Sequence, residues 1–257
     1  MNEGRLRTKA ESFLVNLFAE IIASRFELRA HWNIDHLCYR VETFERYQSL
    51  RSELASFAEF LTESMVNGRP ISCFRLRTPI WFQDWAIDLI ELPAPKPGKP
   101  TKEGFEHIEI VPDLALAEII HTYPKLNFSH KGMDKFFNQE LEISFASGAM
   151  KFHSLSLDSV VKLEQQPSQL QALQKTDVLR RLRGFDAALA GTIPLGLTNK
   201  TSDFDIICSS SDLQNFANIC SDHFSCFDGY RSEMKLVREV PSRIVKFLCE
   251  GIPFEIF

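Results

Sequence analysis

The sequence predicts an α/β protein of the α+β type, in which a β-α-β-β-β unit occurs twice and a smaller αβ domain follows. Two observations predict this fold class. First, a strand, helix and strands pattern begins near residue 34 and restarts near residue 105, and each opening strand carries a histidine at nearly the same point, His36 and His107. Second, a Gly-Thr turn at 191–192 is followed, after ten residues, by the acid–apolar–acid sequence Asp203-Phe204-Asp205.

The first copy of the unit is expected to follow an N-terminal helical segment at 1–30. Residues 8–29 place apolar side chains at helical spacing, which predicts an amphipathic helix. A strand is predicted at 34–41, and Thr43 suits the N-cap of a helix that runs to about Phe60. Three more strands complete the copy, at 60–66, 71–77 and 85–92, with an Asn67-Gly68 turn between the first two.

The second copy begins after a loop that is predicted at 93–104 from its Pro and Gly content. A strand is expected at 105–111 and a short helix at 114–121. A hairpin around Ser147-Gly148 is then expected to join two strands, at 141–145 and 149–155. An internal repeat of this kind places equivalent strand ends around one shared cleft.

The C-terminal part is expected to begin after a linker. Residues 161–176 are polar and rich in Gln, which favours a connector that is partly helical. Thr176 suits the cap of a helix with apolar residues up to Leu189, and residues 177–257 then form the second domain. Its other elements are a strand at Asp203–Ile206, a helix at 211–220, and strand or hairpin material at 224–257.

Composition limits the class of protein. The 257 residues are 44% hydrophobic and 25% charged with a net charge of -5, which indicates an ordinary globular protein and argues against broad nucleic-acid binding. A local basic patch is expected around Arg180, Arg181 and Arg183. The six cysteines form no C-x-x-C pair, so we expect reduced, buried thiols in a cytoplasmic protein. We expect no signal peptide and no membrane-spanning segment.

Four residues on predicted strands suggest a metal site in the repeated part: His36, Glu91, His107 and His153. The first and third open their copies and the other two end them, so they converge if the copies pair by a pseudo-twofold axis. Imidazole and carboxylate together suit a divalent transition metal. Two histidines with one carboxylate would suit Fe²⁺, and four ligands would suit Zn²⁺, Mn²⁺ or Ni²⁺ equally well. The alternative is that the histidines are hydrogen-bonded core residues.

Other side chains are expected to serve the same cleft. Arg40, Arg69 and Arg75 can hold an anionic substrate, because a guanidinium pairs with a carboxylate through two hydrogen bonds. Arg69 precedes a proline and is equally a turn residue. Glu109 shares a strand face with His107 and is expected to act as a base or as a partner that orients a ligand.

Residues 32–155 resemble the vicinal oxygen chelate superfamily, and within it the YecM-type branch. The segments that carry the resemblance are 35–41 (DHLCYRV), 67–71 (NGRPI), 90–96 (IELPAPK) and 106–109 (EHIE). The resemblance implies that residues 31–160 form a metal-binding domain whose paired modules make a cupped mixed sheet. It also implies isomerase, lyase or dioxygenase chemistry, or glutathione transfer, on a small substrate with neighbouring oxygens. By position, the four residues above correspond to the superfamily's metal-bearing strand ends, where the fourth ligand is often Glu.

The C-terminal acids predict a second cation site. Side chains alternate along a strand, so Asp203 and Asp205 point to one side while Phe204 points into the core. Two carboxylates on one face repel each other unless a cation lies between them, and Mg²⁺ is the usual cation where nucleotide phosphates supply other ligands. The short apolar strand at 253–257 adds a third acid, Glu255. The alternative is a polar turn that enters a strand.

Residues 177–257 resemble a minimal nucleotidyltransferase domain, through Gly191-Thr192 and the Ser202-Asp203-Phe204-Asp205 motif. The resemblance implies that Gly191, Thr192 and Ser202 bind nucleotide phosphates, with the Gly191 backbone close to the triphosphate. It implies two Mg²⁺ ions, about 4 Å apart, held by the two aspartates. Glu255 would activate the attacking hydroxyl. Because family members carry helices after the third acid, we expect this domain to be incomplete or a reduced, inactive copy.

These patterns together predict a two-site metalloprotein that takes a small oxygen-rich substrate at one site and an NTP with Mg²⁺ at the other. In one alternative the C-terminal domain is an inactive nucleotide sensor. In another, the whole chain is a non-enzymatic binding or scaffold protein. Neither the substrate, the metal nor the oligomeric state follows from the sequence.

Overall fold

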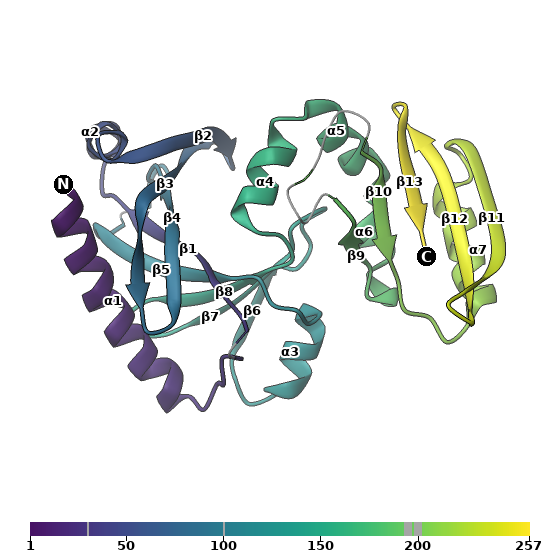
Figure 1. Cartoon of the computed structure of the whole chain (residues 1–257), viewed down its shortest axis with the longest axis horizontal. Coiled ribbons are helices and arrows are strands. Elements are labelled where there is room, and N and C mark those ends of the chain that lie inside the picture. The colour runs from purple at the N-terminus through teal and green to yellow at the C-terminus, as the bar shows by residue number, and fades with distance from the viewer. Residues whose placement is uncertain (30, 100, 193–196, 198–201) are drawn as a thin grey trace. The chain divides into compact units, whose positions relative to one another are not determined.

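The computed structural model describes residues 1–257 except 30, 100, 193–196 and 198–201 (Figure 1). The chain divides into two compact units. Unit 1 comprises Met1–Gly132 and Glu140–His153, and unit 2 comprises Met133–Gln139 and Ser154–Phe257. In the described part of the chain, each helix is too short or too polar to cross a membrane.

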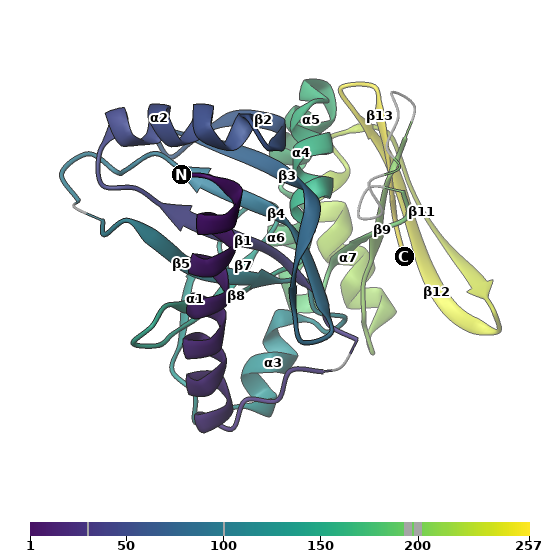
Figure 2. The same cartoon turned by 60° about the vertical axis from the view of Figure 1, so that its left-hand side comes forward.

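Unit 1 begins with helix α1 (Glu3–Ala23), which lies across one face of the sheet (Figure 2). The helix starts five residues before the predicted start, because the Asn2 side chain caps it by accepting from the Arg5 N–H at 2.9 Å. It ends before the predicted end, where Arg25 takes a left-handed φ of 61°. Its buried apolar face packs on the sheet, with Phe13 stacked on Phe105.

The first module matches the predicted β-α-β-β-β order. Its elements are β1 (Ile34–Arg40), α2 (Phe44–Ala55), β2 (Ala58–Val66), β3 (Arg69–Phe82) and β4 (Trp85–Pro93). Thr43 caps α2 as predicted, since its hydroxyl accepts from the Arg46 N–H at 3.1 Å. The turn between β2 and β3 has positive φ at both Asn67 (51°) and Gly68 (77°), which is the type I′ geometry of two-residue hairpins.

The second module repeats this order. Its elements are β5 (Gly104–Ile110), α3 (Leu116–Thr122), β6 (Phe128–Gly132), β7 (Glu140–Ser144) and β8 (Ala149–His153). Strand β6 was not predicted, because its sequence Phe-Ser-His-Lys-Gly lacks clear apolar alternation. The predicted hairpin is confirmed as β7 and β8.

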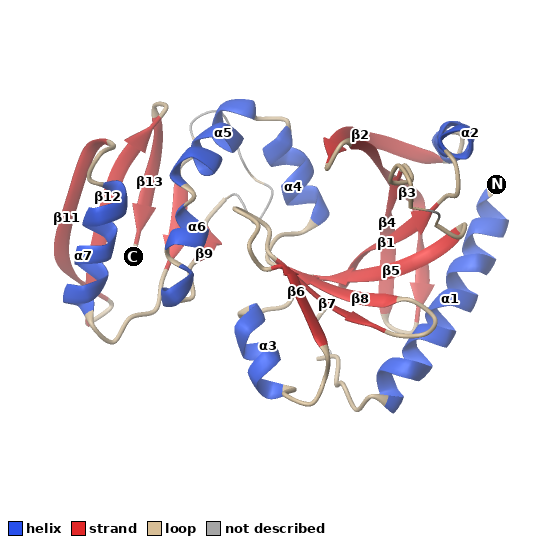
Figure 3. Cartoon of the chain, turned by 180° about the vertical axis from the view of Figure 1, so that it is seen from behind, coloured by secondary structure: helices blue, strands red, loops and turns tan. Residues whose placement is uncertain are grey.

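The two modules form one eight-stranded mixed sheet in the order β2-β3-β4-β1-β5-β8-β7-β6. Strands β1 and β5 are antiparallel neighbours at its centre, β4 is parallel to β1, and β8 is parallel to β5. A pseudo-twofold axis therefore passes between β1 and β5, and the prediction of paired modules in a mixed sheet is confirmed. In Figure 3, β3 and β4 run steeply to β5 and β8, because the sheet twists between them.

Unit 2 is a five-stranded sheet in the order β11-β12-β13-β10-β9, with α7 against one face (Figure 3). Phe204, Phe247 and Phe254 stack at the centre of its core, with ring centroids 4.7 and 4.9 Å apart. The elements are α4 (Leu157–Glu164), α5 (Pro167–Thr176), α6 (Val178–Arg181), a 3₁₀ turn (Arg183–Phe185), β9 (Ala188–Ala190), β10 (Phe204–Ile207), α7 (Leu213–Phe224), β11 (Asp228–Val237), β12 (Val240–Cys249) and β13 (Ile252–Ile256).

Two segments of unit 2 differ from the sequence-based expectation. The connector expected at 161–176 is helical in α4 and α5, and Leu163 and Leu173 are fully buried in the core of unit 2. The single helix expected from Thr176 to Leu189 was wrong. Thr176 ends α5 instead of capping a new helix. The helix that follows covers only Val178–Arg181, Asp186 takes a left-handed φ of 51° after the 3₁₀ turn, and Leu189 lies in strand β9.

Candidate functional site

The two central strands of unit 1 carry the same irregularity at equivalent places. In the pairing of β1 with β5, one extra residue is inserted at Asp35 on β1 and another at Glu106 on β5. Each inserted acid precedes a histidine, His36 or His107. Neighbouring side chains of a regular strand point to opposite faces, but a β-bulge re-aims one of them. Each acid can therefore contact the imidazole of the next residue.

These contacts fix both imidazole rings. His36 Nδ1 lies 2.8 Å from Asp35 Oδ2, and His107 Nδ1 lies 3.1 Å from Glu106 Oε2. A carboxylate can only accept, so each ring carries a proton on Nδ1, and Nε2 is the nitrogen that faces the other acids. This carboxylate–imidazole pairing orients metal-binding histidines in proteins. The sequence analysis did not identify Asp35 or Glu106, although each stands directly before its histidine.

Glu109 lies at the centre of the cluster. Its carboxylate is 3.1 Å from His107 Nε2, 3.4 Å from His36 Nε2 and 3.0 Å from His153 Nε2. Glu91 is farther away, 4.0 Å from His107 Nε2. Ligand atoms of His36, Glu91, His107 and Glu109 all lie within 4.8 Å of one another, and we call these four residues the histidine cluster.

The cluster is buried and strongly polarised. His36 and His107 are 2% and 3% exposed, and the neighbouring His153 is 5% exposed. Burial alone would lower the pKa of His36, but Glu109 and Asp35 outweigh it and hold that pKa well above its ordinary value. Burial would raise the pKa of Glu109, but His153 and His36 hold it well below the ordinary value. Glu109 is thus a carboxylate that stays ionised.

The donor set fits a divalent transition metal. Imidazole nitrogens with carboxylate oxygens suit Zn²⁺, Fe²⁺, Mn²⁺ or Ni²⁺. The buried Nε2 atoms of His36 and His153 both face the Glu109 carboxylate, at 3.4 and 3.0 Å. Three imidazole nitrogens and a carboxylate that converge at one buried point are a donor set of this kind.

The strand register makes Lys151, not His153, the residue of the second module that corresponds to Glu91 of the first. Glu91 pairs with Cys38, two residues after His36, and Lys151 pairs with Glu109, two residues after His107. The expectation that His153 and Glu91 are equivalent strand ends is therefore corrected, since His153 lies two residues further along β8. His153 still contacts Glu109, and it lies 3.5 Å from Glu140.

Lys151 was missed by the sequence analysis. Its side chain is 17% exposed, with Nζ 3.5 Å from Glu140 and 3.7 Å from Glu142. Burial lowers the pKa of Lys151, but Glu109 and Glu140 outweigh it and raise the pKa above its ordinary value. An ammonium that stays charged therefore lies beside the cluster. Lys151 lies two residues from both Ala149 and His153 on β8, so the three side chains share one face of the sheet. This spacing was the only sign in the sequence that Lys151 lies at the site.

The three predicted arginines lie in different places. Arg40 Nε contacts Glu106 Oε2 at 2.9 Å, so Arg40 supports the acid that orients His107. Arg69 donates to the Ala94 carbonyl at 2.8 Å, at the end of β4. Arg75 lies against Asp88 at 3.4 Å, and Asp88 does not belong to the histidine cluster. The structure thus brings Arg40 close to the cluster and gives Arg75 another partner.

Cys38 lies between the two halves of the cluster. It pairs with Glu91 on one side and with His107 on the other, and its thiol falls within 4.8 Å of ligand atoms of Glu106 and His107. Burial and the charge of Glu91 raise its pKa well above the ordinary thiol value. Cys38 is therefore a neutral thiol, in keeping with its expected role as a reduced, buried cysteine.

Unit 2 brings its three acids together. Strands β10 and β13 are parallel, with Asp205 opposite Glu255, and ligand atoms of Asp203, Asp205 and Glu255 lie within 4.8 Å of one another. Burial raises the pKa of Asp205, and the charges of the other two acids raise it further. Lys246 pairs with Glu255 from β12.

Gly191 is required by its contact with Asp205. Its φ is 72°, and a Cβ at this position would lie 2.2 Å from Asp205 Oδ2. A side chain here would strain the left-handed backbone and displace that carboxylate. The carbonyl of Thr192 accepts from the Leu197 N–H at 2.9 Å, and Ser202 is 8% exposed. Most of the predicted spacer between them, 193–196 and 198–201, lies outside the described residues.

Comparison with known proteins finds a match for each of the two parts of the chain. A family model described as YecM protein matches residues 3–164. A second model, described as a domain of unknown function (DUF4269), matches residues 171–257, and this description carries no activity. Protein YecM of Escherichia coli K12 is 30% identical over 149 residues, which cover 51% of this chain and 78% of that protein.

Two further similarities are informative. An uncharacterised protein of Haemophilus influenzae is 40% identical over 82 residues, 32% of this chain, and the chain spans only 43% of that relative. The solved structure titled "Structural Genomics, Protein EC4020" is 25% identical with a TM-score of 0.51, covering 62% of this chain and 91% of that one. A methylmalonyl-CoA epimerase structure is 11% identical with a TM-score of 0.35, covering 47% and 92%, a level that supports no argument about this chain.

Proposed function

This chain belongs to the YecM protein family, and on that premise we propose that unit 1 binds a divalent transition metal ion and acts on a small substrate with two neighbouring oxygens. One observation carries the proposal. The Glu109 carboxylate lies within 3.4 Å of three buried imidazoles, two of which are oriented by acids from matching β-bulges. The sequence resemblance to the vicinal oxygen chelate superfamily supports it.

Each side chain has a definite task in this proposal. His36, His107 and Glu109 would hold the metal, with Glu91 as the fourth ligand. Asp35 and Glu106 keep the imidazoles turned inward. When bound, a divalent metal polarises substrate oxygens as a Lewis acid.

Glu109 is a poor general base, because its pKa is held well below the ordinary value. We therefore infer that it is a ligand rather than the base. Lys151 keeps its proton on Nζ and can donate a hydrogen bond to a substrate oxygen that gains negative charge. The reaction class remains that of the superfamily: isomerisation, C–C cleavage, oxygenation or group transfer.

Elemental analysis of the purified full chain tests the metal proposal. We expect close to one transition metal ion per chain, and a loss of most of it in the His36→Ala, His107→Ala variant, because two of the four ligands are removed. His121→Ala is the matched control, since His121 is exposed on α3 and should leave the metal content unchanged. A metal-free wild-type protein that also takes up no Zn²⁺, Mn²⁺, Fe²⁺ or Ni²⁺ on addition would refute the proposal.

We further propose that unit 2 binds NTP with Mg²⁺ and transfers a nucleotidyl group. The convergence of Asp203, Asp205 and Glu255 supports this second function, together with the sequence resemblance to minimal nucleotidyltransferases. Mg²⁺ prefers carboxylate oxygens and phosphate as ligands, and a cation here would relieve the repulsion that raises the pKa of Asp205.

Calorimetric unfolding with ATP and Mg²⁺ tests the second function. A ligand at 100 times its Kd stabilises the folded state by about 2.7 kcal/mol, so the transition of unit 2 should rise by several degrees. Asp203→Asn with Asp205→Asn should abolish the rise, whereas Asp222→Asn, an exposed acid on α7, should preserve it. Label transfer from α-labelled NTP then separates a transferase from a nucleotide sensor. No shift with any NTP would exclude both roles.

A further inference from the structure

Two tight turns meet beside the end of strand β4. The Asn67-Gly68 turn delivers Arg69 at the start of β3. The second turn is Lys96-Pro97-Gly98-Lys99, closed by a hydrogen bond from the Lys99 N–H to the Lys96 carbonyl at 3.1 Å. Pro at its second position and Gly98 at its third, with φ of 71°, are typical of a type II turn. The turn sets Lys96 and Lys99 side by side at its two ends.

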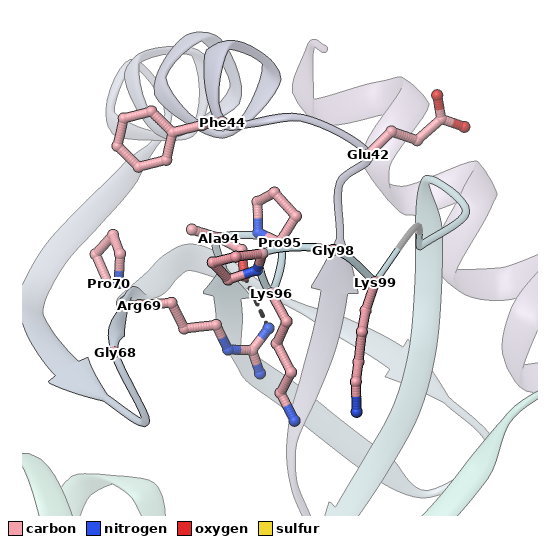
Figure 4. Close-up of a pocket in the computed structure, with 11 residues that line it drawn as sticks. Glu42, Phe44, Gly68, Arg69, Pro70, Ala94, Pro95, Lys96, Gly98 and Lys99 are labelled. Carbon is pink, nitrogen blue, oxygen red and sulfur yellow. Dashed lines mark hydrogen bonds between the residues drawn. The ribbon is translucent and has the colours of Figure 1, made fainter.

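A pocket of about 600 Å³ lies between these turns. Its polar side chains come mainly from Arg69, Lys96 and Lys99, and its floor from the Pro-rich segment Ala94–Pro97. In Figure 4 the three cationic side chains extend in the same direction, while Glu42 points away from them. The Arg69 guanidinium is held in place by its 2.8 Å bond to the Ala94 carbonyl.

Three cations line the pocket against one acid, Glu42, whose side chain points away from them in Figure 4. Glu91 and Glu106 also attract the Arg69 guanidinium. Among the described residues, neither Lys96 nor Lys99 forms an ion pair, and Arg69 Nε is buried without a hydrogen bond. Partial burial lowers the pKa of Lys96, and repulsion from Arg69 and Arg40 lowers it further. Burial and the charge of Arg40 likewise lower the pKa of Arg69. These groups are held close together against their mutual repulsion, which is the arrangement that a polyvalent anion stabilises.

We propose that this turn pocket binds a phosphate or diphosphate group of a small-molecule ligand. One carboxylate carries a single charge, which three cations exceed. A phosphate monoester carries about two negative charges near neutral pH and three acceptor oxygens. A guanidinium pairs with two of those oxygens at once, and two flexible ammonium groups can take the others.

The position of the pocket identifies the class of substrate, and this step rests on the metal function proposed above. Ala94 lies three residues after Glu91, which belongs to the histidine cluster. At about 3.3 Å per residue along a strand, this separation is about 10 Å. One small molecule spans that distance. The substrate of unit 1 is therefore a phosphorylated compound whose neighbouring oxygens reach the histidine cluster.

Calorimetric titration with inorganic pyrophosphate tests the pocket in the full chain after treatment with EDTA. We expect binding that weakens at least about tenfold in Lys96→Gln, Lys99→Gln, because charge-assisted bonds to phosphate are lost. Arg69→Lys should weaken it as well, since the paired guanidinium bonds cannot form. Lys125→Gln, Lys131→Gln, the same loss of two charges at exposed positions of unit 1, should leave the affinity unchanged. Added salt should reduce the affinity of the wild-type chain.

Two results would overturn the proposal: no pyrophosphate binding by the wild-type chain, or binding that is unchanged in the double lysine variant. Binding that persists in that variant but is lost on changing Lys246→Gln would place the anion in unit 2. Because the titration is done without metal, it does not depend on the histidine cluster. A chain that binds pyrophosphate but no transition metal would keep the pocket and refute only the metal function.

Discussion

Replacing Glu109 with glutamine is expected to weaken the binding of a divalent transition metal by more than about 100-fold, because even residues that only orient metal ligands contribute 10- to 100-fold. The carboxylate of Glu109 lies within 3.4 Å of three imidazole nitrogens. Glu91 lies 4.0 Å from the nearest of them, so Glu91→Gln is expected to have the smaller effect. The charge of Glu109 also offsets the two positive charges of the ion, which glutamine cannot do.

Competition for Zn²⁺ with a chromophoric chelator measures both variants on one scale. Glu118→Gln is the matched control, because Glu118 is exposed on α3 and its replacement should not change the affinity. If Glu91→Gln releases the metal while Glu109→Gln retains it, Glu91 is the essential ligand. Glu109 would then be the base or orienting residue that the sequence suggested.

The sequence was sufficient to predict the repeated module. Strands β1 and β5 open with the same acid–histidine pair, and the turn at Asn67-Gly68 fixes the hairpin between β2 and β3. These are local signals, in which neighbouring residues determine the backbone. Strand β6 has no such signal, and it forms because it pairs with β7 in the sheet. Tertiary pairing of this kind cannot be recognised from the strand's own residues.

The site was harder to predict, because it depends on the register of the strands. The β-bulges at Asp35 and Glu106 turn two acids toward the histidines that follow them, yet strict alternation would place them on the opposite face. The register also pairs Lys151 with Glu109, and His153 is the next residue along β8 on the same face of the sheet. A one-residue insertion in the pairing is not visible in the sequence of a single strand.

Unit 2 shows how polar composition misleads. The Gln-rich residues 161–176 suggested a connector, yet Leu163, Ala172 and Leu173 are fully buried there. Gln is a good helix former, so its abundance is compatible with α4 and α5. The few apolar residues at helical spacing were the better guide. Asp205 and Glu255 lie opposite each other on parallel strands. The sequence analysis identified both, because the Asp203-Phe204-Asp205 motif and the apolar strand at 253–257 are short and distinctive.

Replacing Lys151 with methionine is expected to destabilise unit 1 by about 3 kcal/mol, because removal of one partner from a buried set of charges leaves the others uncompensated. The ammonium lies near Glu140 and Glu142, and Glu109 adds to its attraction. Its pKa in the folded state is raised, so this contribution is complete below the unfolded value of about 10.4 and is lost only as the pH rises through the higher folded value. The loss on substitution should therefore be constant across neutral pH.

Urea unfolding followed by tryptophan fluorescence isolates this effect, because all three tryptophans (Trp32, Trp81 and Trp85) belong to unit 1. Lys131→Met, on strand β6 and exposed, is the matched control and should change the stability little. The loss in Lys151→Met should shrink when transition metal is bound, since a divalent cation at Glu109 and Glu91 supplies positive charge to the same carboxylates. If Lys151→Met and Lys131→Met lose equal stability, the charge of Lys151 does not compensate the buried carboxylates. An equal loss with and without metal would mean that the ammonium and the metal site act independently, and Lys151 would then have no place beside the substrate oxygens.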